Sequence, residues 1–457
     1  MAATLGDFDL AIIGTGSGNS LVTPDFDDKR VAIIESGTFG GTCLNVGCIP
    51  TKMYVYAAEV ADSARHASRY GVDAHVDQVR WTDIRDRIFG RIDPISAGGQ
   101  DYRTNGSNTT TFLGHGEFVG PKSIQVSTGA TLTADQIVIA TGGRPMVPPM
   151  VVDSGVPFHT SDTIMRIEAL PSRLLILGGG YIATEFAHVF AGLGCQVSVI
   201  ARSTKLLRHL DGEIADRFTQ VVAGKWELRL GAELAKVSGQ QGEIRLDFTD
   251  GSAATGDLLL VATGRVPNTD RLGLAAAGVR SLSDGRVEVD CYGRTNVDGI
   301  WALGDVSSDY QLKHVANHEA RVVAHNLVHP EALREFDHRF VPSAVFTDPQ
   351  IATVGCTEDE LRGTGRQYRA ITQDYGDTAY GWAMEDQTGI CKLIADPETG
   401  LLLGAHLMGY QASNLIQPLI AAMTFGLPVP EFARGQYWIH PALMEVIENA
   451  LLKLGLN

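Results

Sequence analysis

The chain has 457 residues, and its 37 Lys and Arg residues against 53 Asp and Glu residues give a formal charge of −16. This length leaves room for about three domains. The acidic balance disfavours nucleic acid or an anionic membrane as a partner. The first residues carry acids where a signal peptide has Lys or Arg, and no apolar run reaches membrane length, so we expect a cytoplasmic protein.

The first motif follows a predicted buried strand over residues 8–13. Residues 14–19 are Gly-Thr-Gly-Ser-Gly-Asn, a loop in which Gly14 and Gly16 let the backbone and a helix N-terminus approach a pyrophosphate. The next predicted strand ends at Glu35, where a carboxylate suits the hydroxyls of a ribose. Alone, this motif also fits a glycine turn in another kind of α/β unit.

The same pattern recurs later in the chain. A predicted strand over 174–177 leads into Gly178 and Gly180, and another strand follows at 197–200. Two copies predict two bound nucleotides and an α/β fold with two Rossmann-like domains. Further predicted cofactor contacts lie at the ends of three short apolar runs: Gly142, Gly264 and Asp305.

The two copies differ where the ribose would lie. Glu35 of the first suits a free 2′-hydroxyl, whereas the second has Ala201 and Arg202, with Lys205 and Arg208 nearby. Because arginines bind a 2′-phosphate that a carboxylate would repel, the sequence predicts FAD in the first site and NADPH in the second. The alternative is that Arg202 and Arg208 are only solvated surface charges.

Cys43 and Cys48 are the one group among six cysteines. Five residues of regular helix place two side chains about 140° apart and about 7.5 Å apart along the axis, which prevents a disulfide. Gly47 and Pro50 allow a distortion, and a helix that starts at Pro50 would lower thiol pKa values at its N-terminus. A loop this short gains little stability from cross-linking, which favours a redox role.

Zinc is the other common reason for paired cysteines. It takes about four ligands at shorter spacings, and no second pair occurs, so we expect no metal. Inert buried thiols remain an alternative.

Thiol–disulfide exchange also needs a group that protonates the departing thiol. His440 is the best placed of 13 histidines, because Pro441 suits the first turn of a predicted helix with an apolar stripe. Glu445 is the candidate to orient the His440 ring. On local sequence alone, a plain N-cap histidine fits equally well. Three other histidines compete for the role: His314, His318 and His406.

Taken in order, these motifs resemble the pyridine nucleotide–disulfide oxidoreductases along the whole chain: the Cys-x₄-Cys-Ile-Pro-Thr-Lys motif, both glycine loops, Gly304-Asp305 and His440-Pro-x₃-Glu445. The resemblance implies a homodimer. It also implies four segments: an FAD domain at 1–150, an inserted NADPH domain at 151–270, a return to the FAD and central domain at 271–340, and a C-terminal α+β dimerisation domain at 341–457.

The resemblance also implies roles for residues around the cysteines. By position, Cys43 resembles the thiol that attacks the substrate disulfide, and Cys48 resembles the thiol that faces the flavin. Lys52 and Glu185 resemble a charged pair beside the flavin ring. Thr42, in the same motif, is a further expected cofactor contact.

Other roles follow from position in the same way. His440, supported by Glu445, would come from the partner subunit. Arg202 and Arg208 resemble arginines that bind the 2′-phosphate. Asn19 departs from the family pattern of Gly or Ala, which alters the helix beside the substrate cleft and argues against a glutathione-sized substrate.

Several stretches resemble one group of members more closely: 89–95, 312–321, 374–386 and 409–420. That group, from actinobacteria, reduces mycothione, the disulfide of the sugar thiol mycothiol. We therefore predict an NADPH-dependent flavoprotein that reduces mycothione through Cys43 and Cys48. Dihydrolipoamide dehydrogenase and glutathione reductase are alternatives, and a flavin-holding scaffold subunit without turnover is a third.

Overall fold

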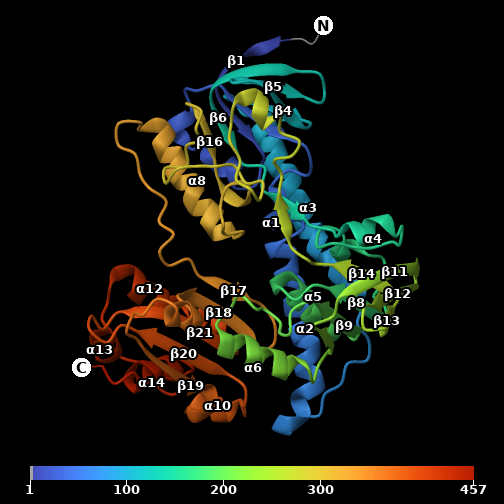
Figure 1. Ribbon diagram of the computed structural model, residues 1–457, viewed down its shortest axis with the longest axis vertical. Helices are drawn as coiled ribbons and strands as arrows, with labels where there is room; N and C mark the ends of the chain where they lie inside the picture. The colour runs from blue at the N-terminus through green and yellow to red at the C-terminus, as the bar shows by residue number, and fades with distance from the viewer. Residues whose placement is uncertain (1–3, 457) are drawn as a thin grey trace.

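The structure is a computed structural model and describes residues 4–456. Residues 1–3 and 457, at the outer ends of the first and last predicted domains, lie outside the described residues. The elements form three groups, around β1 and α8, around β8 and β14, and around β20 and α14 (Figure 1). No helix in the described part of the chain is long and apolar enough to cross a membrane.

The first group contains a mixed sheet in the order β3-β2-β1-β6-β5-β4, with β16 also paired to β6. The strands around β1 are parallel, and Ile12 pairs with Ile33 on one side and Val138 on the other. These positions are buried on both faces, as the apolar runs predict. The strands are β1 Thr4–Ile13, β2 Val31–Glu35, β3 Thr109–Leu113, β4 Gly116–Gly120, β5 Ser123–Val126, β6 Thr131–Ile139 and β16 Ile300–Ala302.

The helices of this group carry several site residues: α1 Gly41–Asn45, α2 Cys48–His66, α3 Trp81–Thr104, α7 Leu274–Ala277 and α8 Lys313–Val328. One expectation is wrong here. The first glycine loop leads into a 3-10 helix, η1 Ser17–Leu21, and not into an α-helix. Pro24 explains the short element, because it has no N–H to donate to the carbonyl of Ser20.

The second group has a parallel sheet in the order β10-β9-β8-β14 and an antiparallel sheet of β11, β12 and β13. Its strands are β8 Arg173–Leu177, β9 Gln196–Ala201, β10 Glu227–Leu230, β11 Leu234–Gln240, β12 Glu243–Phe248, β13 Ala253–Gly256 and β14 Leu258–Val261. Its helices are α4 Pro149–Asp153, α5 Tyr181–Gly192 and α6 Gly212–Val222. Strands β7 Gly143–Pro145 and β15 Arg265–Pro267 pair where the chain enters and leaves this group.

The third group is an antiparallel sheet in the order β17-β18-β21-β20-β19 with helices on it. The strands are β17 Ser343–Val345, β18 Gln350–Gly355, β19 Arg369–Asp374, β20 Ile390–Ala395 and β21 Leu402–Gly409. The helices are α9 Glu358–Arg362, α10 Ala379–Ala383, α11 Ala412–Leu415, α12 Gln417–Phe425, α13 Val429–Arg434 and α14 Glu445–Lys453.

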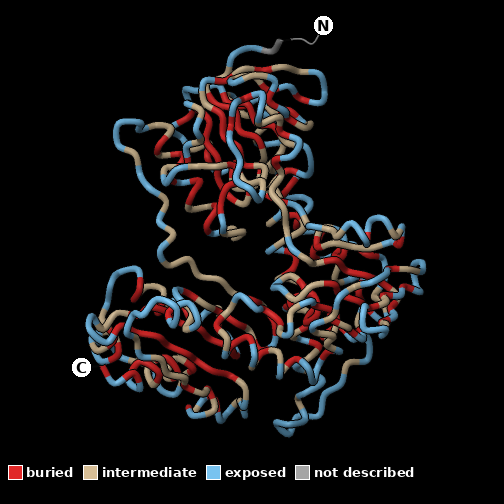
Figure 2. The backbone as a smooth tube through the Cα atoms, in the orientation of Figure 1, coloured by how far each residue is buried: buried red, intermediate tan, exposed pale blue. Residues whose placement is uncertain are grey.

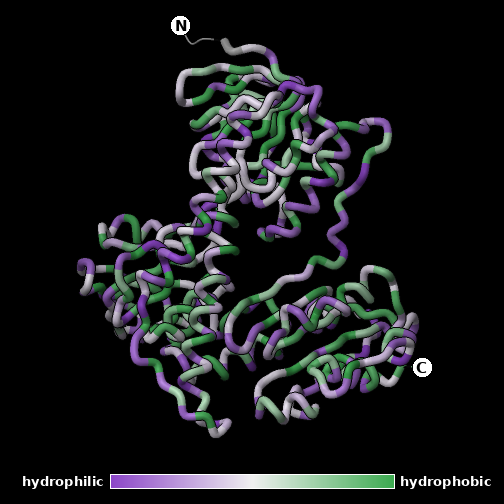
Figure 3. The backbone as a smooth tube through the Cα atoms, turned by 180° about the vertical axis from the view of Figure 1, so that it is seen from behind, coloured by the Kyte–Doolittle hydropathy of each residue, from purple (hydrophilic) through white to green (hydrophobic). Residues whose placement is uncertain are grey.

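A long connection joins α8 to this third group. No residue between 329 and 344 is buried, and Figure 2 shows this connection in the colours of exposed and intermediate residues. It is largely hydrophilic when seen from behind (Figure 3). A few of its apolar side chains, Leu333, Phe336 and Phe340, still pack against the cores at its two ends.

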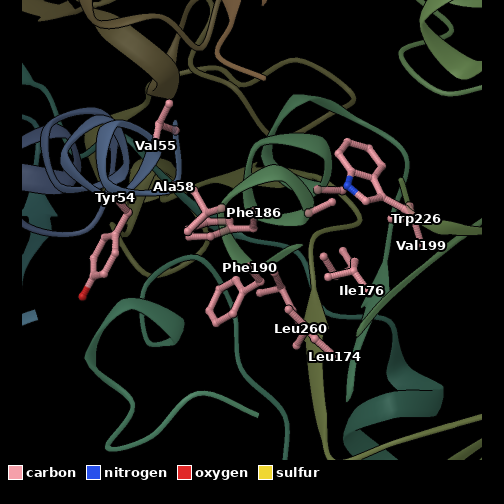
Figure 4. Close-up of a cluster of buried hydrophobic side chains, with 14 of the residues drawn as sticks. Tyr54, Val55, Ala58, Leu174, Ile176, Phe186, Phe190, Val199, Trp226 and Leu260 are labelled. Atoms are coloured by element: carbon pink, nitrogen blue, oxygen red, sulfur yellow. The ribbon is translucent and has the colours of Figure 1, made fainter. Parts of the chain in front are cut away.

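The joint between the first two groups is an apolar cluster between α2 and α5 (Figure 4). Tyr54 and Ala58 of α2 meet Phe186 and Phe190 of α5, and all four side chains are buried. The Tyr54 hydroxyl donates a 2.6 Å hydrogen bond to the carbonyl of Met165. This packing fixes α2, which begins at one cysteine, against α5.

Candidate active site

The two cysteines lie on either side of a break between two helices. Cys43 belongs to α1, and Cys48 is the first residue of α2. Gly47 makes the break with φ −132° and ψ −124°, and a Cβ there would lie 2.9 Å from the carbonyl oxygen of Thr42. The sequence predicts a helix start at Pro50, but α2 starts two residues earlier, at Cys48. Pro50 is still in the first turn, where its missing N–H is not needed.

The break lets the two thiols approach each other, and each changes the other's acidity. Both are free thiols in this structure. The hydrogen bond with Cys48, together with burial, raises the pKa of the Cys43 thiol. The same hydrogen bond, with help from the charge of Lys52, lowers the pKa of Cys48 to about 7. Cys48 is therefore the thiol of the pair that ionises first.

Lys52 and Glu185 form an ion pair beside Cys48. The Lys52 Nζ lies 2.6 Å from Glu185 Oε2, and the Glu185 side chain is buried. The backbone N–H of Phe346 donates a 3.0 Å hydrogen bond to Glu185 Oε1, and its ring centroid lies 4.4 Å from Lys52 Nζ. All three groups of elements therefore meet at this pair, because Lys52 belongs to the first, Glu185 to the second and Phe346 to the third. The predicted pairing of Lys52 with Glu185 involved only the first two groups.

One cavity of about 1050 Å³ connects the cysteines with the end of β2. The predicted site residues that line it are Gly14, Gly16, Glu35, Thr42, Cys43, Cys48, Lys52, Gly142, Glu185 and Asp305. At Gly14, φ is +106° and a Cβ would lie 2.4 Å from the carbonyl oxygen of Ala140, so only glycine fits. The lining and the close backbone approach at the glycine loop could hold a nucleotide cofactor between Glu35 and Cys48.

Glu35 has partners within the glycine loop itself. Its Oε2 accepts hydrogen bonds from Thr15 N at 2.9 Å and Thr15 Oγ1 at 2.6 Å, and its Oε1 accepts one from Gly37 N at 2.7 Å. The carboxylate thus shapes the glycine loop in this structure.

Asp305 lies at the end of β16. Burial raises the pKa of the Asp305 carboxyl, whose Oδ2 lies 3.9 Å from Arg265 Nε.

The second glycine loop has the same tight geometry. Gly178 has φ +140°, and a Cβ there would lie 2.2 Å from the carbonyl oxygen of Ala262. Gly180 is the N-cap of α5, and Gly264 has φ +137°. Here the N-terminus of a twelve-residue α-helix faces the loop, which suits a phosphate. These three glycines are not among the residues that line the cavity with the cysteines.

Arg202 and Arg208 lie just after β9, beside this loop. Both are exposed, and no ion pair among residues 4–456 involves either of them. The Arg208 Nε donates a 3.3 Å hydrogen bond to His209 Nε2. Two guanidinium groups without carboxylate partners at the end of this strand are free to bind an anion.

His440 lies in a loop of the third group. Its Nδ1 is 2.7 Å from Glu445 Oε1, and its side chain is 72% exposed. The predicted helix start at Pro441 is wrong, because α14 begins at Glu445. The Glu445 N–H bonds to the carbonyl of Ala442, three residues back, which makes a turn and not an α-helix over 441–444. His440 does not line the cavity that holds the cysteines.

The rival histidines have structural partners. His406 is buried and contacts Thr353 Oγ1 and the carbonyl of Cys356. His314 Nε2 lies 2.8 Å from the carbonyl of Pro342, and His318 Nε2 accepts a hydrogen bond from Asp337 N at 3.0 Å. Among these histidines, only His440 pairs with a carboxylate while most of its ring stays exposed.

Sequence reasoning missed several residues in the cavity: Tyr181, Arg265, Lys313 and Phe346. Burial raises the pKa of Tyr181, which directly follows the second glycine loop. That position was one available signal. Arg265 directly follows Gly264, and Lys313 lies in the stretch 312–321, so both were next to or within singled-out segments. No local pattern marks Phe346.

The comparisons with known proteins agree with this geometry. Residues 8–320 match the family described as "Pyridine nucleotide-disulphide oxidoreductase", and residues 341–451 match its dimerisation domain. The chain is 57% identical to the mycothione reductase of Mycobacterium tuberculosis over 98% of this chain and 99% of that protein. It is 33% identical to the glutathione reductase of Burkholderia cepacia, with 96% and 97% covered.

A solved structure is similar over almost the whole length. The HOCl-induced flavoprotein disulfide reductase RclA from Escherichia coli has a TM-score of 0.86 and 28% sequence identity. The match covers 97% of this chain and 99% of that chain.

Proposed function

The chain belongs to the pyridine nucleotide-disulphide oxidoreductases, and on that premise we propose that it is an NADPH-dependent FAD enzyme that reduces mycothione. The single observation that carries the proposal is the cavity of about 1050 Å³, which runs from Glu35 to the Cys43–Cys48 pair and the Lys52–Glu185 pair. A bound flavin dinucleotide there would take hydride from NADPH and pass two electrons to the cysteine disulfide.

The residues of the chain then perform the thiol chemistry. The Cys43 thiolate attacks one sulfur of mycothione, so that a Cys43–substrate disulfide forms and the substrate disulfide breaks. The first mycothiol leaves with a proton from His440. The Cys48 thiolate attacks the Cys43 sulfur and closes the Cys43–Cys48 disulfide, and the second mycothiol leaves as a thiolate that takes a proton from water. Two electrons from NADPH thus reduce one disulfide to two thiols.

His440 would act in the partner subunit of a homodimer. Support comes from the matching dimerisation domain and from the exposure of apolar neighbours, since Tyr437 is 102% exposed and Ile439 is 75% exposed. Large apolar side chains around a polar residue are typical of a surface that another chain covers. Glu445 would hold the ring orientation through its 2.7 Å contact with Nδ1, which leaves Nε2 for the substrate.

Mycothione as substrate is supported by the 57% identical relative of that name. The decisive experiment assays one preparation with NADPH and with NADH against mycothione, glutathione disulfide and lipoamide. We expect the highest kcat/KM for NADPH with mycothione. A preference for lipoamide with NADH, or for glutathione disulfide, would contradict the proposal, and no turnover in an FAD-loaded preparation would favour the scaffold alternative.

The domain borders belong to the same proposal. We place them at 1–150, 151–270, 271–340 and 341–457, with the protein working in the cytoplasm. The pairing of β7 with β15 supports the inserted position of the second segment, because these strands hold the two crossings together.

The acidity of Cys48 predicts a pH dependence. In the NADPH-reduced enzyme, the long-wavelength absorption of a thiolate beside the flavin should grow as the pH rises, with a midpoint of about 7, because Cys48 carries the lowered pKa. A spectrophotometric titration measures this midpoint, and Cys48→Ser is the control that should lack the band. A midpoint near that of an ordinary thiol would contradict the assignment.

The exposed arginines predict coenzyme selectivity. Replacing either Arg202 or Arg208 by Leu should lower kcat/KM for NADPH by about 10-fold to 100-fold, because a charge-assisted hydrogen bond contributes about 1.5–3 kcal/mol. The value for NADH should not change. Arg245→Leu, an exposed arginine on β12, is the matched control. An equal loss with both coenzymes would mean that the arginines do not read the 2′-phosphate.

A further inference from the structure

Lys313 is a cation inside the cavity that the proposed function leaves without a role. It is the first residue of α8 and is partly buried. Its Nζ donates a 2.8 Å hydrogen bond to Ser17 Oγ, which donates a 3.2 Å hydrogen bond to Asn317 Oδ1. No ion pair in the part of the chain that the structure describes includes Lys313. Lys313 is therefore not directly paired with a carboxylate, although its charge also acts on Asp305 of the same cavity, against the burial that raises the pKa of that carboxyl.

The backbone brings this cation to Cys43. Ser17 follows Gly16 in the first glycine loop, and that loop packs directly on α1. A Cβ on Gly41 would lie 2.5 Å from the Cα of Gly16, so the two backbones touch. Gly41 is the first residue of α1, two residues before Cys43. Ser17, Cys43 and Lys313 line the same cavity.

We propose that Lys313 supplies the positive charge that stabilises Cys43 as the attacking thiolate. The proposal rests on the proposed function, in which Cys43 attacks the substrate disulfide. Cys43 needs such help because Cys48 is the thiol that ionises first, and a nearby ammonium favours a thiolate. The charge of Lys313 does lower the pKa of Cys43, against the larger effects of the Cys48 hydrogen bond and burial.

The other charged groups nearby leave this task to Lys313. Lys52 of α2 is paired with Glu185 of α5 at 2.6 Å, and it acts on Cys48. Asp305 at the end of β16 faces Arg265 at 3.9 Å. His314, next to Lys313 on α8, is engaged with the Pro342 carbonyl. Within its own chain, Lys313 is thus the cation whose charge favours a Cys43 thiolate, whereas His440 of the partner subunit would serve the departing thiol.

The role predicts the reactivity of one sulfur. We would reduce the FAD enzyme with NADPH, alkylate it with iodoacetamide over a range of pH, and follow Cys43 and Cys48 separately by peptide mass spectrometry. In Lys313→Met, the midpoint for Cys43 should rise by about one pH unit, which slows its alkylation at pH 7 about tenfold. Lys313→Arg should restore the midpoint, and Lys236→Met, an exposed lysine of β11, is the control for the loss of one charge.

Other outcomes are separable. An unchanged Cys43 profile in Lys313→Met overturns the proposal, and so does a shifted flavin potential with unchanged Cys43 alkylation, which would mean that Lys313 acts on the flavin. If Lys313→Met does not fold, Ser17→Ala releases the Lys313 ammonium and should raise the same midpoint, whereas no rise overturns the role. Absence of NADPH-dependent thiols in the unaltered enzyme would instead refute the proposed function.

Discussion

A mixture of two inactive variants should regain about a quarter of the activity of the unaltered enzyme. Cys43→Ser lacks the attacking sulfur, and His440→Gln lacks the proton donor and should lose about 10²-fold to 10⁴-fold. If His440 serves the partner subunit, a heterodimer of the two variants has one site with both residues intact. Random exchange at equal amounts gives about half heterodimers, each with one working site of two. Activity against mycothione after exchange measures this.

The control joins both changes in one chain. A mixture of Cys43→Ser with the double variant Cys43→Ser/His440→Gln forms the same kinds of dimer but no intact site, so it should stay inactive. Heterodimers are identified by a tag on one variant. If tagged heterodimers form and activity does not return, His440 acts within its own chain, and the exposed loop around Tyr437 needs another explanation.

The motifs that lie within one loop could be predicted from the sequence. Gly14 and Gly178 follow buried strands, and each takes a positive φ that the glycine pattern implies. Cys43 and Cys48 needed a broken helix, and Gly47 provides it. These features depend on a few adjacent residues, and the types of those residues determine which backbone conformations are allowed.

The remainder depends on contacts between distant segments. Phe346 reaches Glu185 with its N–H, and Lys313 reaches Ser17 with its ammonium, across 161 and 296 positions of the chain.

The predicted starts of two helices were wrong for a different reason. Pro50 and Pro441 both suit a first turn, but α2 starts before Pro50 and α14 starts after Pro441. Proline limits the backbone at one position and does not decide which turn is the first.

The largest expected effect on stability comes from Lys392, in the middle of β20. Its side chain is 5% exposed, and its Nζ lies 2.9 Å from Asp211 Oδ1 and 2.7 Å from Glu358 Oε2. Asp211 is the N-cap of α6, so the cluster joins α6 of the second group to the sheet of the third group. Burial opposes the charge of Asp211, yet hydrogen bonds from Lys392 and from the Glu358 N–H hold its pKa below the ordinary value.

Lys392→Met should therefore lower the free energy of unfolding by about 3–5 kcal/mol, because it leaves the carboxylate of Asp211 buried without its partner. Urea unfolding followed by circular dichroism measures the loss, and Lys236→Met should stay within about 0.5 kcal/mol of the unaltered protein. Because the pKa of Asp211 is lowered on folding, its contribution is present above the ordinary aspartate pKa and is lost as the pH falls through the lowered value. The gap between Lys392→Met and the unaltered protein should narrow in acid. Equal stability of the variant and the unaltered protein at pH 7 would mean that α6 and the sheet of the third group are held together without this cluster.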